Sequence, residues 1–180
     1  MKRILVIVVL AMAVPSLTFG QATEKKTASS SKSKAARSNK RASADEAAIR
    51  KLQDDIVAAF NAADLDRLMS FHTDDVIYLA PGKPVIEGWK AVRADFQAIF
   101  EGWTQRRVIA KLEAQSPHEV VVCGAWAFAR GQSTLTFTSK DGSTPTQVFA
   151  KFISIYRRQP DGSWKRCRQI RNGDRPQDNI

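Results

Sequence analysis

Apolar residues in the middle of the chain recur with a helical period. After Ser43 they fall every three or four positions and share one helix face: Ile49, Leu52, Ile56, Ala59, Phe60 and Ala63. Ser43 and Glu46 have the capping-box spacing, which predicts that this helix begins near Ser43. Asp64 opens a second short helix, whose apolar contacts are Leu65, Leu68, Met69 and Phe71. A third helix is expected from Gly88 through Glu101.

The second half of the chain alternates between apolar and polar residues, as strands do. Short strands are expected at 76–79 and 84–87, and long strands at 105–115, 119–137, 146–158 and 163–172. Gly124 and Gly131 are candidate bulge or bend sites inside the third-last strand. Helices followed by a run of hairpins predict an α+β fold, with the helices on one face of a curved antiparallel sheet.

The N-terminus has the pattern of an export signal. Lys2 and Arg3 precede an unbroken apolar run of eleven residues, Ile4–Val14. Such a run of about 7–15 residues is typical of a secretory signal, whereas a membrane span needs about 20. Small residues at the −3 and −1 positions predict cleavage after Gly20 or Ala22. We therefore expect a signal peptide at 1–22 and an exported protein, periplasmic or secreted; the alternative is an uncleaved membrane anchor.

The positive charge of the chain is concentrated in one segment. The net charge is +10, and residues 21–43 contain seven basic side chains against a single acidic one and no Leu, Ile, Val or aromatic residue. Such a segment cannot bury enough apolar surface to fold, so a basic disordered linker is expected at 23–43. It is either a solvated tether or a contact with an anionic envelope surface or nucleic acid. Residues 44–180 hold 19 basic and 17 acidic residues, so the domain itself has little long-range attraction for nucleic acid.

Export to an oxidising compartment makes the two cysteines relevant. Cys123 and Cys167 fall on predicted strands that are not neighbours. Strands lie about 4.8 Å apart and a disulfide needs Cα atoms within roughly 7 Å, which favours two buried free thiols over one disulfide.

Several short motifs occur in a characteristic order. They are Asn61–Asp64, Asp74-Asp75, Ile86–Gly88 and the stretch from Lys151 through Trp164-Lys165. Together they resemble the nuclear transport factor 2-like (ketosteroid isomerase-like) superfamily, and within it the SnoaL-like subgroup called domain of unknown function 4440. The resemblance implies a SnoaL-like domain at 44–175, a C-terminal tail at 176–180, and a cone: a curved sheet wrapped around the N-terminal helices, with a pocket at one end. The superfamily includes isomerases, cyclases, hydrolases, dehydratases and non-enzymatic association modules, so the fold alone does not fix the function.

The resemblance also tests one catalytic mechanism. Ketosteroid isomerases use an Asp as general base, with a Tyr and a protonated Asp that stabilise an enolate. The corresponding positions here are Ala80, Ile56 and Ser154, and neither Ala nor Ile can transfer a proton. The sequence also contains no metal-ligand spacing, no GxSxG and no phosphate loop. We therefore expect no cofactor or metal, and the sequence identifies no catalytic residue.

When the strands are aligned with those of ketosteroid isomerases, one set of side chains falls inside the cone. The candidate ligand-binding residues are Tyr78, Trp89, Ser154, Tyr156, Gln169, Arg171 and His72. Trp89 is expected at the rim, and His72 is the candidate for titration near neutral pH. Such a pocket suits a small aromatic or amphiphilic ligand with an acidic or carbonyl group. The alternative is that Phe152 and Tyr156 simply fill the cone and that Arg171 reaches solvent.

The opposite faces of the last two strands predict self-association. The same alignment places these residues on the outer face of the sheet: Phe149, Lys151, Ile153, Ile155, Arg157, Arg166, Arg168, Ile170 and Asn172. An apolar centre with a charged rim is typical of an interface, so a symmetric homodimer is expected. Three functions remain open: a small-molecule-binding cone that could be a lyase or isomerase, a non-catalytic dimeric binding or association module, and an envelope-attached protein that acts through its tail.

Overall fold

The computed structural model describes residues 24–114, 117–141 and 144–174. The predicted signal peptide at 1–22 and the C-terminal tail at 176–180 lie outside the described residues, so both stay predictions. Within the described ranges, no helix is long and apolar enough to span a membrane.

Helix α1 spans Glu24–Asn61, and the chain divides into two compact units at residues 1–38 and 39–180. The segment expected to be a disordered linker, 23–43, is therefore helical from Glu24 onward, and Ser43 does not begin the helix. Ala, Lys and Arg favour helices, and extending an existing helix costs less than nucleating a new one. The capping box does not form, because Ser43 lies inside the helix; the Glu46 carboxylate accepts hydrogen bonds of 3.1 and 2.7 Å from Arg50.

The remaining elements follow the predicted order. They are α2 (Leu65–Ser70), β1 (His72–Leu79), β2 (Ile86–Glu87), α3 (Trp89–Gln105), β3 (Val108–Ala114), β4 (Glu119–Cys123), β5 (Trp126–Ser139), β6 (Thr146–Arg158) and β7 (Trp164–Gly173). As expected, Asp64 caps α2: its side chain accepts a 3.0 Å hydrogen bond from the Arg67 backbone N–H. The α+β class is thus as the sequence predicted.

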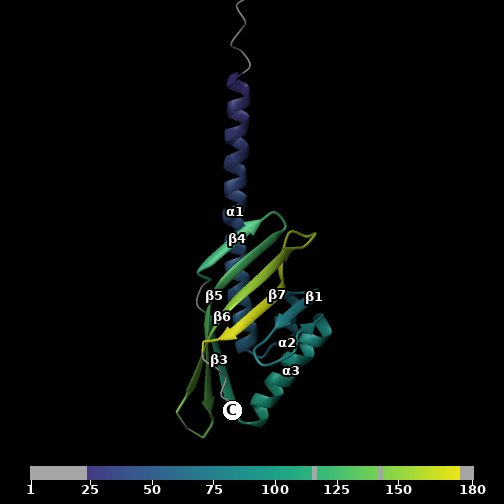
Figure 1. Cartoon of the computed structure of the whole chain (residues 1–180), viewed down its shortest axis with the longest axis vertical. Helices are drawn as coiled ribbons and strands as arrows, with labels where there is room; N and C mark the ends of the chain where they lie inside the picture. The colour runs from purple at the N-terminus through teal and green to yellow at the C-terminus, as the bar shows by residue number, and fades with distance from the viewer. Residues whose placement is uncertain (1–23, 115–116, 142–143, 175–180) are drawn as a thin grey trace, which may run out of the picture. The chain divides into compact units, whose positions relative to one another are not determined.

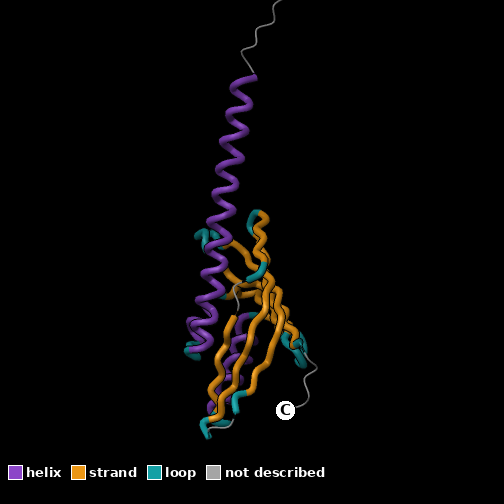
Figure 2. The backbone as a smooth tube through the Cα atoms, turned by 90° about the vertical axis from the view of Figure 1, so that its left-hand side faces the viewer, coloured by secondary structure: helices purple, strands orange, loops and turns teal. Residues whose placement is uncertain are grey.

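One sheet carries all seven strands in the order β2-β1-β7-β6-β5-β3, with β4 also paired to β5. The sheet is curved and open, and the part of α1 from Asn39 lies behind it (Figures 1 and 2). The expectation of a wholly antiparallel sheet is wrong at one pair, since β1 and β7 run parallel. A hairpin imposes antiparallel pairing only on strands joined by a tight turn, and these two lie at opposite ends of the domain sequence.

The single long strand expected at 119–137 is a hairpin of two strands. Cys123 pairs with Trp126, which leaves Gly124 and Ala125 as a two-residue turn. Gly124 has a φ of 61° and no positive φ occurs at Ala125, a combination that matches a type II′ turn with Gly at its first central position. Gly124 therefore reverses the chain rather than bending it.

The core forms where the predicted apolar face of α1 meets the helices and the concave face of the sheet. Buried members from α1 are Ile49, Leu52, Ile56, Ala59 and Phe60, and α3 contributes Val92 and Phe96. Ala63, expected on the same face, is instead exposed in the turn after α1, with a φ of 50°.

Polar contacts attach α1 to the sheet at two places. The Asp45 carboxylate accepts hydrogen bonds from the Arg158 guanidinium and from the Trp164 indole N–H at 3.4 Å, and Arg158 stacks on the Trp164 ring at 4.4 Å. At the end of α1, the Asn61 side-chain amide pairs with the backbone of Leu112 on β3, donating to its carbonyl at 2.9 Å and accepting from its N–H at 2.7 Å. These contacts fix the helix along the sheet.

We predict that Gly131→Ala destabilises the domain. Gly131 lies opposite Phe152 in the sheet, and a Cβ there would stand 2.9 Å from the ring. Overpacking of this kind costs about 1–3 kcal/mol, measurable by urea unfolding. Phe152→Leu should make room for the methyl group, so a double-mutant cycle should show favourable coupling. Additive effects of the two substitutions would contradict this contact.

Candidate functional site

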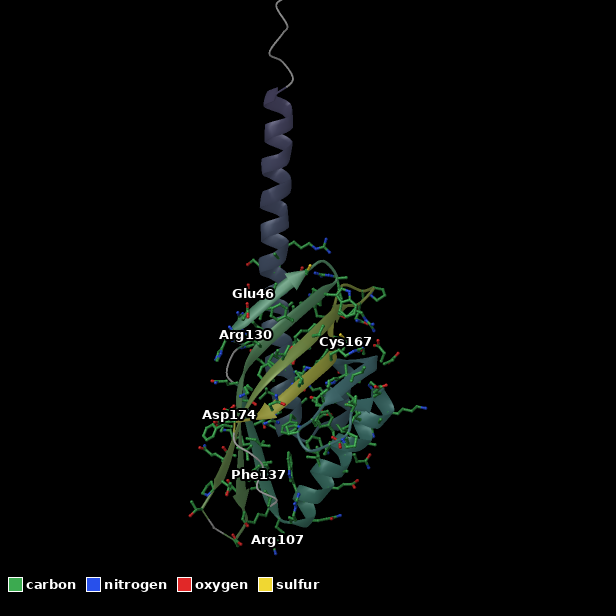
Figure 3. All side chains as sticks on the ribbon, in the orientation of Figure 1. Glu46, Arg107, Arg130, Phe137, Cys167 and Asp174 are labelled. Carbon is green, nitrogen blue, oxygen red and sulfur yellow. The ribbon has the colours of Figure 1, made fainter. Side chains whose placement is uncertain are left out.

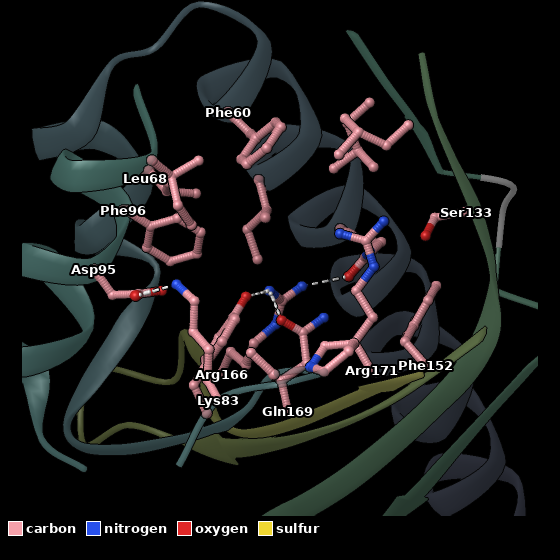
Figure 4. A pocket seen from close by; sticks show the side chains of 18 of the residues that line it. Phe60, Leu68, Lys83, Asp95, Phe96, Ser133, Phe152, Arg166, Gln169 and Arg171 are labelled. Atoms are coloured by element: carbon pink, nitrogen blue, oxygen red, sulfur yellow. Dashed lines mark hydrogen bonds and ion pairs between the residues drawn. The ribbon is translucent and has the colours of Figure 1, made fainter. Parts of the chain in front are cut away.

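A cavity of about 220 Å³ lies inside the cone, between the helices and the concave face of the sheet (Figure 4). Its aromatic wall consists of Phe60, Phe96, Trp103 and Phe152. Several of these rings meet edge to face, with centroids 6.3 Å apart for Phe60 and Phe96 and 5.6 Å apart for Phe60 and Trp103. The cone is therefore not filled by its own aromatic side chains.

Three of the predicted ligand-binding residues line the cavity. Tyr78 reaches it from β1, and Gln169 and Arg171 reach it from β7. On β6, the predicted inward residues Phe152, Ser154 and Tyr156 are all buried, but only Phe152 lines the cavity.

The other four predicted residues lie behind or beside the cavity wall. Tyr156 is fully buried and donates a 2.9 Å hydrogen bond to Gln53. Ser154 is fully buried, with no hydrogen-bond partner for its hydroxyl among the described residues. The half-buried Trp89 donates from its indole to the Met69 carbonyl at 3.1 Å, and His72 packs behind Tyr78 with ring centroids 6.1 Å apart. None of the four is among the residues that line the cavity.

Arg166 lines the cavity, although the sequence placed it on the outer face. Tyr156 pairs with Arg166 whereas the neighbouring Ile155 pairs with Arg168, so β7 carries one extra residue, Cys167. A bulge of this kind reverses the alternation of side chains. Arg166 therefore points inward before the bulge, while Gln169 again points inward after it.

The guanidinium of Arg166 is bound by neutral side chains from three elements. Its Nη1 donates to the Tyr78 hydroxyl at 3.3 Å and to Gln169 Oε1 at 3.1 Å, and its Nη2 donates to Gln53 Oε1 at 2.8 Å. Arg166 is only 2% exposed, and its Nε has no hydrogen-bond partner in the described part of the chain. The hydrogen bonds thus satisfy most of its donors without neutralising its charge.

Other polar groups line the cavity from neighbouring elements. Arg171 is half-buried, and desolvation lowers the pKa of its guanidinium. Lys83, in the loop between β1 and β2, forms an ion pair with Asp95 of α3 (Figure 4). Burial raises the pKa of the Tyr78 phenol, which therefore stays protonated at neutral pH.

The two positions that the resemblance assigns to a base and a tyrosine also line the cavity. They are Ala80 and Ile56, and neither carries a group that transfers protons. The one carboxylate at the cavity wall is Asp95, which Lys83 already pairs. Among the described residues, no group of three or more His, Cys, Asp and Glu side chains could hold a metal ion.

His72 does not titrate near neutral pH, contrary to its proposed role. It is 1% exposed, and its Nδ1 lies 2.9 Å from the Leu68 carbonyl, so Nδ1 carries the proton and donates it. Burial, reinforced by the charge of Arg166, lowers the pKa of His72 to about 3. The ring is therefore a neutral part of the core at physiological pH.

Both cysteines are free thiols, as the sequence favoured. Cys167, labelled in Figure 3, is buried, and its thiol donates to the Ile155 carbonyl at 3.3 Å. Cys123 was expected to be buried too, but it is exposed because it lies beside the β4–β5 turn.

Comparison with known proteins connects this site to a family. The family model described as a SnoaL-like domain matches residues 54–167. A ketosteroid isomerase-like protein from Erwinia carotovora atroseptica is 26% identical, with a TM-score of 0.59 over 72% of this chain and 96% of its own. A conserved protein from Planctomyces limnophilus is 28% identical, with a TM-score of 0.62 over 72% and 98%.

A third structure shares the fold at lower identity. It is a Catenulispora acidiphila protein in complex with S-DNPA, 16% identical, with a TM-score of 0.61 over 73% of this chain and 95% of its own. No curated protein sequence matches the chain.

We predict that the buried His72 makes the domain acid-sensitive. Its pKa is about 3 when folded but about 6.5 when unfolded. Above pH 6.5 neither state binds the proton; as the pH falls below it only the unfolded state does. Stability should therefore decline from about pH 6.5 downward, by up to about 1.4 kcal/mol per pH unit. Urea unfolding between pH 7 and about 5, above the carboxylate range, measures this slope.

His72→Asn should flatten that slope, because the amide can donate to the Leu68 carbonyl without binding a proton. The wild-type protein, measured at the same pH values, is the reference for the slope. An unchanged slope in His72→Asn would show that another group controls the acid response.

Proposed function

Because this chain belongs to the SnoaL-like domain family, we propose that it is a small-molecule-binding protein whose ligand occupies the cavity inside the cone. The observation that carries this proposal is the cavity itself, with about 220 Å³ of space, an aromatic wall and a few convergent polar groups. That combination is typical of ligand sites. The SnoaL-like and nuclear transport factor 2-like group includes ligand-binding and isomerase-type members, and the complex of the Catenulispora protein with S-DNPA is consistent with binding in this fold.

The size of the cavity limits the ligand. Sites for drug-sized molecules measure about 300–1,000 Å³, which is more than the 220 Å³ found here. An engineered apolar cavity of about 150 Å³ in another protein binds benzene. A molecule with one ring and a small substituent therefore fits within this space.

Binding is favoured over steroid-isomerase-type catalysis. Ala80 and Ile56 occupy the wall where that mechanism needs a base and a phenol, and Asp95 is engaged by Lys83. A lyase or isomerase reaction would have to use Tyr78 or the arginines. Export of the domain, which the predicted signal peptide supports, would place this binding activity outside the cytoplasm.

A second proposal concerns the outer face of the sheet, where we expect a symmetric homodimer. Phe149, Ile153 and Ile170 there are 48%, 46% and 39% exposed, and Ile153 pairs directly with Ile170 across β6 and β7. Large apolar patches left in water favour association. The rim charges are partly balanced, since Arg157 forms 3.0 and 2.6 Å hydrogen bonds with the Asp75 carboxylate. The alternative function, a non-catalytic dimeric association module, depends on this outer face.

We predict that Ala80→Phe abolishes ligand binding. Ala80 lines the cavity in the loop after β1, so a benzyl group there should fill the space without disturbing the core. Saturation-transfer NMR with single-ring aromatic probes should give signals for the wild type and none for this variant. Ala94→Phe, on the exposed face of α3, is the control and should bind like the wild type. Equal signals from all three proteins would place the binding elsewhere.

We also predict that Ile153→Asp converts the protein to a monomer. A carboxylate at the centre of the apolar patch would have to be buried without a partner, which is costly. Light scattering at tens of micromolar should report a dimer for the wild type. Ile109→Asp is the matched control, because Ile109 is 55% exposed but lies on β3, outside the patch. A monomeric wild type, or a dimer that survives Ile153→Asp, would contradict the proposed interface.

A further inference from the structure

The cavity wall carries an excess of positive charge. Three cationic side chains, Lys83, Arg166 and Arg171, line the cavity, against the single carboxylate of Asp95. Lys83 and Asp95 form an ion pair with each other, so their charges are already balanced. No carboxylate among the described residues pairs with either arginine. Two guanidinium charges therefore face the cavity uncompensated.

The burial of Arg166 makes this imbalance costly. All the groups that accept its hydrogen bonds, on Tyr78, Gln169 and Gln53, are neutral. Neutral acceptors hold the guanidinium in place, but they do not replace the counter-charge that a buried cation needs. An anion inside the cavity would supply that counter-charge.

Arg171 offers the open binding position. It is on the same strand as Arg166, lies beside Phe152 of β6 in the sheet, and lines the cavity. In contrast to Arg166, its guanidinium makes no hydrogen bond to any described residue, and Figure 4 shows it pointing into the space near Ser133. A planar guanidinium with free N–H groups matches the two oxygens of a carboxylate.

The rest of the wall selects the body of the ligand. Tyr78 and Phe96 meet edge to face with centroids 5.3 Å apart, next to the rings of Phe60 and Trp103. A further ring can add to this edge-to-face arrangement. The Tyr78 oxygen accepts from Arg166, which leaves its own proton for a ligand oxygen.

From these contacts we propose that the ligand is a single-ring aromatic monocarboxylate, with its carboxylate on Arg171 and its ring against the aromatic wall. The proposal rests on the proposed binding function and specifies the chemical class that this function leaves open. Arg166 then acts as a positioning residue, which supplies positive potential without releasing its protein partners. The ion pair of Lys83 and Asp95 is not needed for this contact.

Three probes with the same phenyl ring separate the effect of charge from the effect of shape. Benzoate carries the carboxylate, benzamide is its neutral isostere, and phenyl phosphate carries a larger anion. Calorimetry on the mature protein should find that benzoate binds at least about tenfold more tightly than benzamide, the range expected for a charge-assisted pair of hydrogen bonds. Phenyl phosphate should bind more weakly than benzoate, because a dianion is costlier to desolvate.

Arg171→Met keeps the apolar stem and removes the charge. It should weaken benzoate binding about tenfold to a hundredfold and leave benzamide binding unchanged within about twofold. The benzoate affinity of Arg171→Lys should lie between those of the wild type and Arg171→Met, because an ammonium cannot donate two parallel hydrogen bonds to one carboxylate. The control is Arg130→Gln, on the exposed face of β5, which should bind both compounds like the wild type.

The melting temperature without ligand distinguishes binding from structure. Removing an unpaired, half-buried charge should raise the melting temperature of Arg171→Met. Such a gain is typical of residues that are kept for function although they lower the stability of the fold. A marked fall would show that Arg171 supports the fold, and would overturn the proposal.

The ligand series has equally clear outcomes. Equal affinity for benzoate and benzamide, or tighter binding of phenyl phosphate, would overturn the monocarboxylate class and leave the proposed binding function intact. Failure of both benzoate and benzamide to bind the wild type would overturn this proposal. If neutral aromatic probes also gave no saturation-transfer signal, the proposed function would fail with it.

Discussion

A buried positive charge must be held in place without an acid, and the arrangement of the domain depends on how this is done. Gln53 comes from α1, Tyr78 from β1 and Gln169 from β7, and each accepts from Arg166. These hydrogen bonds tie the first helix to the parallel strand pair that joins the two ends of the domain sequence. They also make one side of the cavity polar, while the rings opposite keep the other side apolar.

The sequence was most informative where burial selects one face of an element. Along β6 the predicted inward and outward residues are correct from Phe149 to Arg157, because a slip by one position would expose the core. The same rule placed Tyr78, Gln169 and Arg171 at the cavity. The apolar face of α1 was predicted for the same reason, because it depends on local spacing and on the demand to bury apolar surface.

The errors arose where a local signal had two structural meanings. Gly124 was consistent with a bend or a turn, and only the pairing of Cys123 with Trp126 decides between them. Arg166 was missed because a bulge leaves little trace in sequence: a cationic residue on a predicted outer position looks like an ordinary solvated one. The consecutive burial of Arg166 and Cys167 marks the bulge, and it is visible only after folding. Likewise, His72 was misjudged because its pKa depends on burial behind Tyr78, which no local pattern reveals.

The extra residue in β7 means that this strand can lose one position without changing the chemistry of the cavity. If Cys167 were deleted, the strand would regain a regular alternation, with Arg166, Gln169 and Arg171 still on the inner face and opposite the same residues of β6. At its present length, a strand without the bulge would turn either Arg166 or both Gln169 and Arg171 outward, because an odd spacing separates Arg166 from the other two. A relative whose last strand is one residue shorter could therefore carry the same polar lining, and an alignment with this chain would need a gap at Cys167 to show it.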